Sequence, residues 1–160
     1  MADTYITKDI RKWLDVERDV RVSPPISESD IRKWAIAVYW PETPPKKYWD
    51  AEYARTSRWG GIVAPEEFNP FAWPIERQET VRLGGEIGKE PGKRVLNGGS
   101  EARYYTPMRP GDVIRSGTKL VEVYEKTGRL GIMMFLINET TWTNQNGEVV
   151  KVDRKTNIRY

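Results

Sequence analysis

The sequence predicts a single α+β domain in which one antiparallel sheet packs against helices. Two observations carry this prediction. Helical spacing of apolar residues is confined to the N-terminal half, whereas long runs with strand character fill residues 112–159. A chain of 160 residues suits one hydrophobic core, and no internal repeat divides it. We therefore expect residues 1–160 to form one domain, with its helices before its strands.

The first predicted elements are short. A helix is expected over residues 4–14, and residues 16–22 alternate valines with charged residues, which favours an edge strand. The helical spacing in the first segment is that of Ile6, Ile10, Trp13 and Leu14.

A clearer helix is predicted over residues 27–40. Ser27 can cap its first turn, and Asp30 three residues later can complete a capping box. The helix is expected to end before Pro41, because PETPP at residues 41–45 favours an extended linker. Its apolar face has the spacing i, i+3, i+4, i+7 and comprises Ile31, Trp34, Ala35 and Val38.

Two further helices and a loop are predicted before the sheet. YWDAEYART at residues 48–56 favours a short helix, and GGIVAPEEFNPFAW at residues 60–73 favours another, with Pro65 in its first turn. Pro70 predicts a stop or kink near Asn69. Residues 74–93 are rich in glycine and charge, which predicts a long loop or flap.

The C-terminal half is predicted to be strands joined by tight turns. Residues 96–107 lead to a turn at residues 109–112, and Asn146-Gly147 is a strong hairpin signal. Residues 131–143 are apolar on both faces near their middle, which predicts a central strand. The strand over residues 113–125 alternates between two faces. One face is expected to hold Ile114, Leu120 and Tyr124, and the other Val113, Val121 and Val123.

Composition excludes several kinds of chemistry. The chain has no cysteine and no histidine, so disulfides, Ser-His triads and ordinary zinc sites are excluded. Its net charge of +3 suits anionic ligands. The chain has no block of five or more like charges, which argues against nucleic-acid binding. No apolar run is long enough to span a membrane, and the first residues lack a signal peptide's apolar stretch, so we expect a cytoplasmic protein.

Aromatic residues and carboxylates are the remaining candidates for a site. Five tryptophans, at positions 34, 40, 49, 59 and 73, predict a contribution to a core, a pocket or an interface. Without histidine, acid–base work would fall to a carboxylate such as Glu42, Asp50 or Glu66. Gly60-Gly61 before the predicted helix would offer N–H groups to an anion-like oxygen.

The order of these segments resembles the MaoC-like hydratase/dehydratase family, and most of all its N-terminal MaoC-like type. The resemblance covers residues 16–159 and is carried by YWDAEYARTSRWGGIVAP, RPGDVI and EVYEKTGRLGIMMFLINETTWTNQNGEVV. It implies a hotdog fold, in which an antiparallel sheet wraps around a central helix and two such units pair. It also implies hydration of trans-2-enoyl-CoA thioesters to (R)-3-hydroxyacyl-CoA, or the reverse dehydration, without a metal or resident cofactor.

The family motif Asp-x-Asn-Pro-x-His-x-Asp matches this chain only in part. Its last aspartate matches Asp50, its histidine position falls on Tyr48, and its catalytic aspartate position falls on Thr43, or on Glu42 with one gap. Both catalytic side chains are therefore replaced. By the resemblance, the remaining thioester or acyl-CoA contacts would come from Gly60, Gly61, Ile62, Val63, Ala64, Pro65, Tyr48, Trp49 and Asp50.

Three hypotheses follow from this departure. The first is a partner-dependent hydratase subunit that shapes the pocket for a bulky acyl-CoA while a second hotdog subunit supplies Asp and His. The second is a homodimeric hydratase or thioesterase that uses a carboxylate. The third is an acyl-CoA-binding module without turnover.

Overall fold

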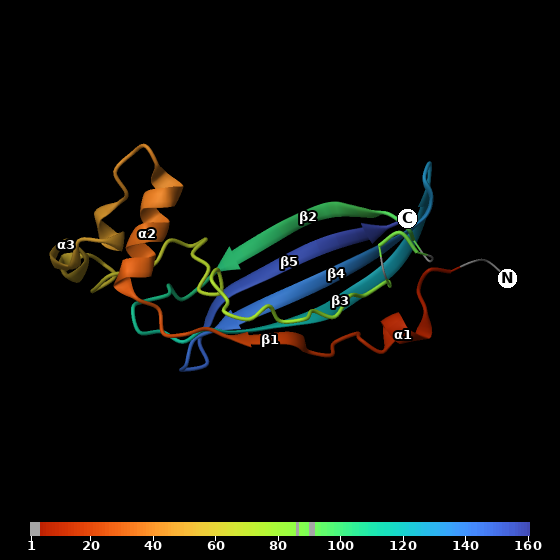
Figure 1. Cartoon of the computed structure of the whole chain (residues 1–160), viewed down its shortest axis with the longest axis horizontal. Helices are drawn as coiled ribbons and strands as arrows, with labels where there is room; N and C mark the ends of the chain where they lie inside the picture. Colours follow the sequence, from red (N-terminus) through yellow and green to blue (C-terminus); the bar gives the residue numbers. More distant parts are fainter. Residues whose placement is uncertain (1–3, 86, 90–91) are drawn as a thin grey trace.

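The computed structural model describes residues 4–85, 87–89 and 92–160, and its centre is one five-stranded antiparallel sheet. The strands lie in the order β1-β3-β4-β5-β2. Their bounds are Arg18–Val22 (β1), Val95–Tyr104 (β2), Arg115–Gly128 (β3), Gly131–Thr143 (β4) and Val149–Arg159 (β5). Figure 1 shows one long twisted layer. The predicted edge strand, central strand and three long C-terminal strands are confirmed.

Tight turns join the strands where the sequence predicts them. Asn144 closes the β4–β5 hairpin, because its backbone oxygen accepts from the N–H of Gly147 at 3.0 Å and its Oδ1 accepts from the N–H of Glu148 at 3.1 Å. In the turn before β3, the N–H of Asp112 donates to the oxygen of Arg109 at 3.1 Å. Both predicted turns are confirmed.

A bulge in β3 changes which of its side chains share a face. Leu120 pairs with Asn138, but Glu122 pairs with Ile137, so Val121 is one residue extra. An extra residue shifts the alternation by one position. Leu120 is fully buried, and Val123 packs in the same cluster. The prediction that these two residues face opposite sides is therefore wrong.

The described residues form four short helical elements, of which α2 is the longest. Their bounds are Lys8–Arg11 (α1), Glu28–Tyr39 (α2), Lys46–Tyr48 (η1, a 3₁₀ turn) and Ala51–Thr56 (α3). Ser27 caps α2 as predicted, because its Oγ accepts from the N–H of Asp30 at 3.0 Å. None of these helices has the length and apolar character to cross a bilayer.

Two helix predictions need correction in their detail. The helix expected over residues 4–14 shortens to α1, because the chain turns afterwards and the N–H of Asp15 donates to Leu120 of β3 at 2.9 Å. In α2 the buried stripe runs through Ile31, Ala35 and Tyr39. Val38 lies outside that stripe and is 56% exposed.

The helix predicted over residues 60–73 is wrong, since this segment is an irregular loop with a turn at Pro65–Phe68. Its backbone bonds to other parts of the chain instead. The N–H of Val63 donates to Lys47 at 3.3 Å, and that of Ala64 donates to Met108 at 2.8 Å. These long-range bonds hold the segment extended, and Pro70 removes a further donor that a helix would use.

The helices α2 and α3 lie at one end of the sheet. Figure 1 shows α2 and α3 together at that end, with α1 and the C-terminus toward the other. The longest described helix therefore does not run along the middle of the sheet. The described part of residues 74–93 forms neither helix nor strand, which confirms the predicted loop, and residues 86, 90 and 91 of that prediction lie outside the described residues.

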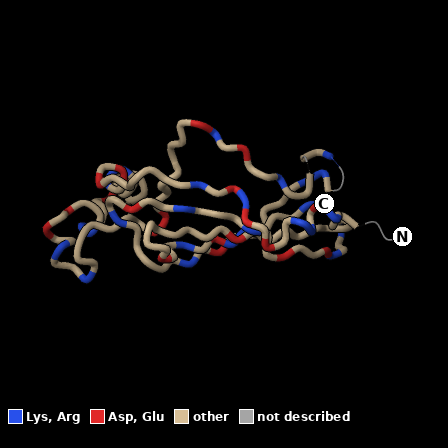
Figure 2. Tube along the Cα trace, turned by 90° about the horizontal axis from the view of Figure 1, so that it is seen from below, with Lys and Arg blue, Asp and Glu red and all other residues tan. Residues whose placement is uncertain are grey.

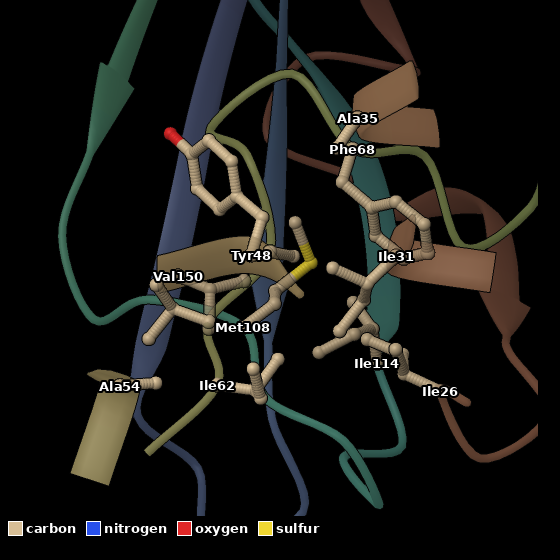
Figure 3. Close-up of a cluster of buried hydrophobic side chains, with 12 residues drawn as sticks. Ile26, Ile31, Ala35, Tyr48, Ala54, Ile62, Phe68, Met108, Ile114 and Val150 are labelled. Atoms are coloured by element: carbon tan, nitrogen blue, oxygen red, sulfur yellow. The ribbon is translucent and has the colours of Figure 1, made fainter. Parts of the chain in front are cut away.

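Two hydrophobic clusters flank the sheet. The larger one joins α2, the 60–71 loop and the sheet at the helical end, and Figure 3 shows most of its members. The smaller one lies between α1 and the middle strands. The larger cluster consists of Ile26, Ile31, Ala35, Tyr48, Ala54, Ile62, Val63, Ala64, Phe68, Met108, Ile114 and Val150.

Candidate functional site

A pocket of 350 Å³ opens beside the larger cluster, where η1, residues 59–67 and residues 104–108 meet. That volume lies in the range of small-molecule sites in proteins. Its apolar lining includes Val63, Ala64, Met108 and Val150. Its polar lining includes Tyr39, Lys47, Tyr48, Glu66, Glu67, Tyr104, Tyr105 and Thr106.

Tyr48 connects the pocket to the core. Its ring is buried against Met108 and Val150, while its hydroxyl points away from the apolar cluster (Figure 3). The ring of Tyr39 lies 6.0 Å away, centroid to centroid. The neighbouring Tyr48 hydroxyl, and to a smaller extent burial, raise the pKa of Tyr39 above its usual value of 10.0. Tyr39 therefore keeps its proton at neutral pH and cannot act as a base there.

Lysine side chains supply positive charge near the tyrosines. Lys47 Nζ lies 4.9 Å from the Tyr48 ring centroid and 5.7 Å from that of Trp59. Lys151 Nζ lies 5.4 Å from the ring of Tyr104 and 3.5 Å from a carboxylate oxygen of Glu67. These cations stand over aromatic faces, an arrangement that holds them in place. An anionic ligand group in the pocket would meet Lys47, whereas Lys151 is not among the lining residues.

One polar atom of the pocket has no partner in the described part of the chain. The hydroxyl of Tyr104 is buried and makes no hydrogen bond there. A buried hydroxyl without a partner is unfavourable by about 1–3 kcal/mol. The pocket therefore offers one donor that a ligand or a neighbouring subunit could satisfy.

The structure brings only some of the predicted site residues to this pocket. Tyr48, Val63, Ala64, Pro65 and Glu66 line it. Gly60, Gly61, Ile62, Trp49 and Asp50 lie close by in sequence but are not among its lining residues.

The other predicted polar residues have local structural contacts. Asp50 caps α3, and Trp49 Nε1 donates to the oxygen of Pro44 at 2.9 Å. Glu42 and Thr43 are exposed and lie outside the pocket lining. The two positions that would match the catalytic aspartate are thus displaced from Tyr48's pocket.

The predicted anion-binding helix start is absent. Residues 60–73 form no helix, so no helix dipole acts there. Three N–H groups of the segment are already engaged, since Gly60 donates to Ser57 at 3.0 Å and Val63 and Ala64 donate as described above. Between the described residues no hydrogen bond uses the N–H of Glu66 or Glu67, two pocket residues in the Pro65–Phe68 turn.

Sequence reasoning missed several lining residues. Tyr39, Lys47, Tyr104, Tyr105 and Met108 were not candidates, although all five line the pocket. The pair Tyr104-Tyr105, shortly before the turn at residues 109–112, could have been a signal, because aromatic side chains commonly line ligand pockets. Tyr39 reaches the pocket through the packing of α2 against η1, which no local sequence motif predicts.

Arg109 joins the two loops that form the pocket wall. Its Nη2 donates to the backbone oxygen of Trp59 at 2.7 Å, and its N–H donates to Oδ2 of Asp112 at 2.8 Å. One side chain thus ties the turn before β3 to the start of the 59–67 loop. These two hydrogen bonds of Arg109 fit a rigid binding wall. The described pocket lining contains no histidine–carboxylate pair for proton transfer.

The five-stranded antiparallel sheet and its helices have the hotdog fold of MaoC-like dehydratases. The chain belongs to the family described as "FAS1-like, dehydratase domain region", whose sequence model matches residues 17–152. The resemblance that the sequence motifs predict is thereby confirmed. A search of curated proteins found no match.

Solved structures of the same fold cover nearly the whole chain. A chain of the ChsH1-ChsH2 complex from Mycobacterium tuberculosis has a TM-score of 0.69 and 20% identity, over 96% of this chain and 97% of that one. The MaoC-like dehydratase from Rhodospirillum rubrum has a TM-score of 0.58 and 18% identity, over 89% and 91%. A chain of the C-terminally truncated HadBC (3R-hydroxyacyl-ACP dehydratase) complex from Mycobacterium tuberculosis has a TM-score of 0.57 and 16% identity, over 91% and 98%.

Proposed function

We propose that this chain is a non-catalytic or partner-dependent subunit of an (R)-specific enoyl-CoA hydratase or 3-hydroxyacyl-CoA dehydratase. In this proposal the chain shapes the acyl pocket for a long or bulky acyl-CoA. A second hotdog subunit supplies the catalytic aspartate and histidine. The acyl-CoA is the substrate, and no resident cofactor is required.

One observation carries the proposal: a phenol, Tyr48, lies on the pocket wall at the position that matches the family's histidine. A tyrosine has an ordinary pKa of about 10 and is a poor base at pH 7. Loss of a general acid–base group lowers a rate by about 10²–10⁴-fold. A family member with this replacement is expected to depend on another chain for proton transfer.

The exposed edge of the sheet supports a partner. β2 lies at one edge, is ten residues long, and its residues up to Arg103 are all exposed. A long strand edge carries unpaired N–H and C=O groups, which a second chain can pair. Two similar solved structures come from complexes of different chains, ChsH1-ChsH2 and HadBC. We infer that a second hotdog subunit covers part of this surface.

The lining supports binding of a thioester with an apolar acyl chain. Val63, Ala64, Met108 and Val150 form an apolar wall next to Lys47, Glu66 and the tyrosines. The N–H groups of Glu66 and Glu67 take the place of the Gly60–Gly61 amides as candidate donors to the thioester oxygen. Which acyl chain is bound depends on the partner's half of the pocket.

Reconstitution tests the proposal. The chain is purified alone and together with the hotdog protein encoded beside it, and hydration of a long-chain trans-2-enoyl-CoA is followed. We expect no activity from the chain alone, activity from the pair, and loss of that activity when the partner's motif histidine becomes alanine. Substantial turnover by the chain alone would contradict the proposal.

A second function is favoured by one observation, the presence of Glu66 in the pocket. Of the three predicted carboxylates, Glu66 alone lines the pocket, because Asp50 caps α3 and Glu42 is exposed elsewhere. A homodimeric hydratase or thioesterase would therefore use Glu66. Glu66→Gln would abolish its activity, while Glu42→Gln would leave it unchanged.

An acyl-CoA-binding module without turnover is the remaining alternative. Calorimetry with a long-chain enoyl-CoA separates it from a purely structural subunit. Binding without turnover, alone and with the partner, supports the module. If no enoyl-CoA binding is detected, the remaining role of the chain is a structural one in the complex.

A further inference from the structure

A second cavity, of 480 Å³, lies on the sheet beside the smaller hydrophobic cluster, which shares Leu83 and Leu136 with the cavity lining. β3, β4 and β5 form its floor through Thr118, Asn138, Thr140 and Asn157 among others. Residues 80–85 and 87, here called the strap, form its other wall. The first pocket shares no lining residue with it.

Charge distinguishes this cavity from the rest of the surface. Figure 2 shows basic and acidic residues interspersed along the whole trace. The cavity lining departs from that mixture, with one carboxylate, Asp19, facing four cationic residues. These are Arg18, Arg82, Lys155 and Arg159.

Lys155 and Arg159 are tied to neighbouring groups of the chain. Lys155 Nζ lies 3.1 Å from Oδ2 of Asp153, and Arg159 Nε donates to the oxygen of Gly92 at 2.9 Å. Arg159 is buried, and burial lowers the pKa of its guanidinium.

Arg18 is a buried cationic side chain in the cavity lining. Its side chain is only 7% exposed. Nη1 donates to Oδ2 of Asp19 at 2.6 Å, and Nη2 donates to Oδ1 of Asn138. Its Nε is buried and has no hydrogen-bond partner among the described residues. A buried donor of a charged group is strongly unfavourable without an acceptor.

Asp19 accepts from Nη1 of Arg18 but not from its Nε. Its other carboxylate oxygen, Oδ1, accepts from the N–H of Val81 at 2.9 Å and so fixes the strap over the sheet. Asp19 has a φ of +53° beside a register shift in β1, a conformation that is uncommon for residues other than glycine and that aspartate tolerates better than most. Such a backbone is maintained where the surrounding contacts require it. The ion pair therefore positions Arg18 and the strap together.

Neutral polar groups lie on the floor of the cavity near Arg18. The hydroxyls of Thr118 and Thr140 are 2.8 Å apart, and either can donate outward while it accepts from the other. Asn138 lies on the same strand as Thr140. Beyond these groups the lining becomes apolar, with Leu83, Ile87, Val95 and Leu136.

We propose that this cavity binds an amphiphilic small molecule through a single anionic group, a carboxylate or a phosphate monoester. The anionic group accepts from Arg18 and from the Thr118–Thr140 pair. The apolar body lies under the strap against Leu83 and Leu136. This inference does not depend on the proposed enzymatic function, because it uses a different cavity and requires no thioester.

Calorimetry on the full chain with three probes of equal length tests this inference: decanoate, decyl phosphate and decanol. We expect one or both anions to bind at least about tenfold more tightly than decanol, since hydrogen bonds to charged groups are stronger than those to neutral groups. Tighter binding of decanoate assigns a carboxylate, and tighter binding of decyl phosphate assigns a phosphate. Equal affinity for all three, or no binding of either anion, would overturn the inference.

Variants locate the site. Arg18→Met is expected to reduce anion affinity by about tenfold or more without changing decanol binding. Thr140→Val keeps the side-chain shape, removes one hydroxyl, and should weaken anion binding several-fold even if Arg18→Met does not fold. The matched control is Arg115→Met, which removes an exposed cation that pairs with Glu17 outside the cavity. Equal loss in Arg115→Met and Thr140→Val would also overturn the inference.

Discussion

The carboxylate of Asp50 accepts a hydrogen bond of 3.0 Å from the backbone N–H of Tyr53. Asp50 is thereby the N-cap of α3, a helix of only six residues. The sequence motif places Asp50 two residues after Tyr48, beside the lost catalytic position. Its contacts show that it organises the backbone next to the pocket.

The first prediction concerns this cap. Asp50→Ala should lower the free energy of unfolding by about 1 kcal/mol, because an N-cap side chain satisfies an otherwise unpaired helix donor. Asp50→Asn should retain most of the stability, since asparagine caps equally well. Urea unfolding followed by circular dichroism measures both. An equal loss in the two variants would show that charge, rather than capping, is what matters.

The second prediction compares adjacent glycines. Gly60 has a φ of +65°, so Gly60→Ala should destabilise the fold by about 1–2 kcal/mol. Gly61 needs no such φ, and an added Cβ would meet only Arg109 Nη1, at 3.7 Å. Gly61→Ala should therefore be close to neutral. Thermal unfolding of the two variants is the measurement, and similar shifts for both would contradict the assigned backbone.

The sequence predicts the sheet well because its signals are local. Alternation along β3, the apolar middle of β4, and turn residues such as Asn146-Gly147 act within a few positions of the chain. The helix predicted over residues 60–73 fails because long-range bonds decide that segment. Val63 donates to Lys47 and Ala64 donates to Met108, and neither partner can be inferred from a local pattern.

The candidate site shows the same limit. Tyr48 and Ala64 could be predicted from the motif that carries the family resemblance. Tyr39 and Tyr104 come from α2 and β2, and only the fold brings them to the pocket. The bulge at Val121 could not be predicted either, because the alternating sequence around it shows no local signal for an extra residue. Local sequence patterns therefore predict the pocket residues in the motif segment, but not those that α2 and β2 contribute to the pocket wall.

The third prediction tests that bulge. Leu120→Ala should lower the free energy of unfolding by about 2–5 kcal/mol, because Leu120 is fully buried and truncation leaves a cavity. Val121→Ala should lower it by less than about 1 kcal/mol, since the bulge places Val121 outside both clusters. Denaturant unfolding gives both values. A larger effect at Val121 would mean that the strand alternates without a bulge.

The fourth prediction concerns the pH dependence of the tyrosine pair. The Tyr48 hydroxyl raises the pKa of Tyr39 above 10.0. The folded state therefore holds this proton more tightly than the unfolded state does. Its contribution to stability is complete below about pH 10 and is lost as the pH rises through the folded pKa.

Tyr48→Phe removes the main cause of that shift. The pKa of Tyr39, followed by NMR of ring-labelled tyrosine, should fall toward its ordinary value, and the loss of stability above pH 10.0 should become smaller. Tyr105→Phe is the control, because Tyr105 lines the same pocket but is not among the causes of the Tyr39 shift. An unchanged Tyr39 titration in Tyr48→Phe would contradict the pairing.

The last prediction separates a partner-dependent subunit from a carboxylate enzyme. Glu66 is the predicted carboxylate that lines the pocket, and Glu67 beside it contacts Lys151 at 3.5 Å. If a partner performs proton transfer, Glu66→Gln should change the hydration rate of the reconstituted pair by less than about tenfold. Loss of a true general base lowers a rate by about 10²–10⁴-fold. Steady-state kinetics of the pair distinguish these ranges, and a loss in the larger range would transfer the chemistry to this chain.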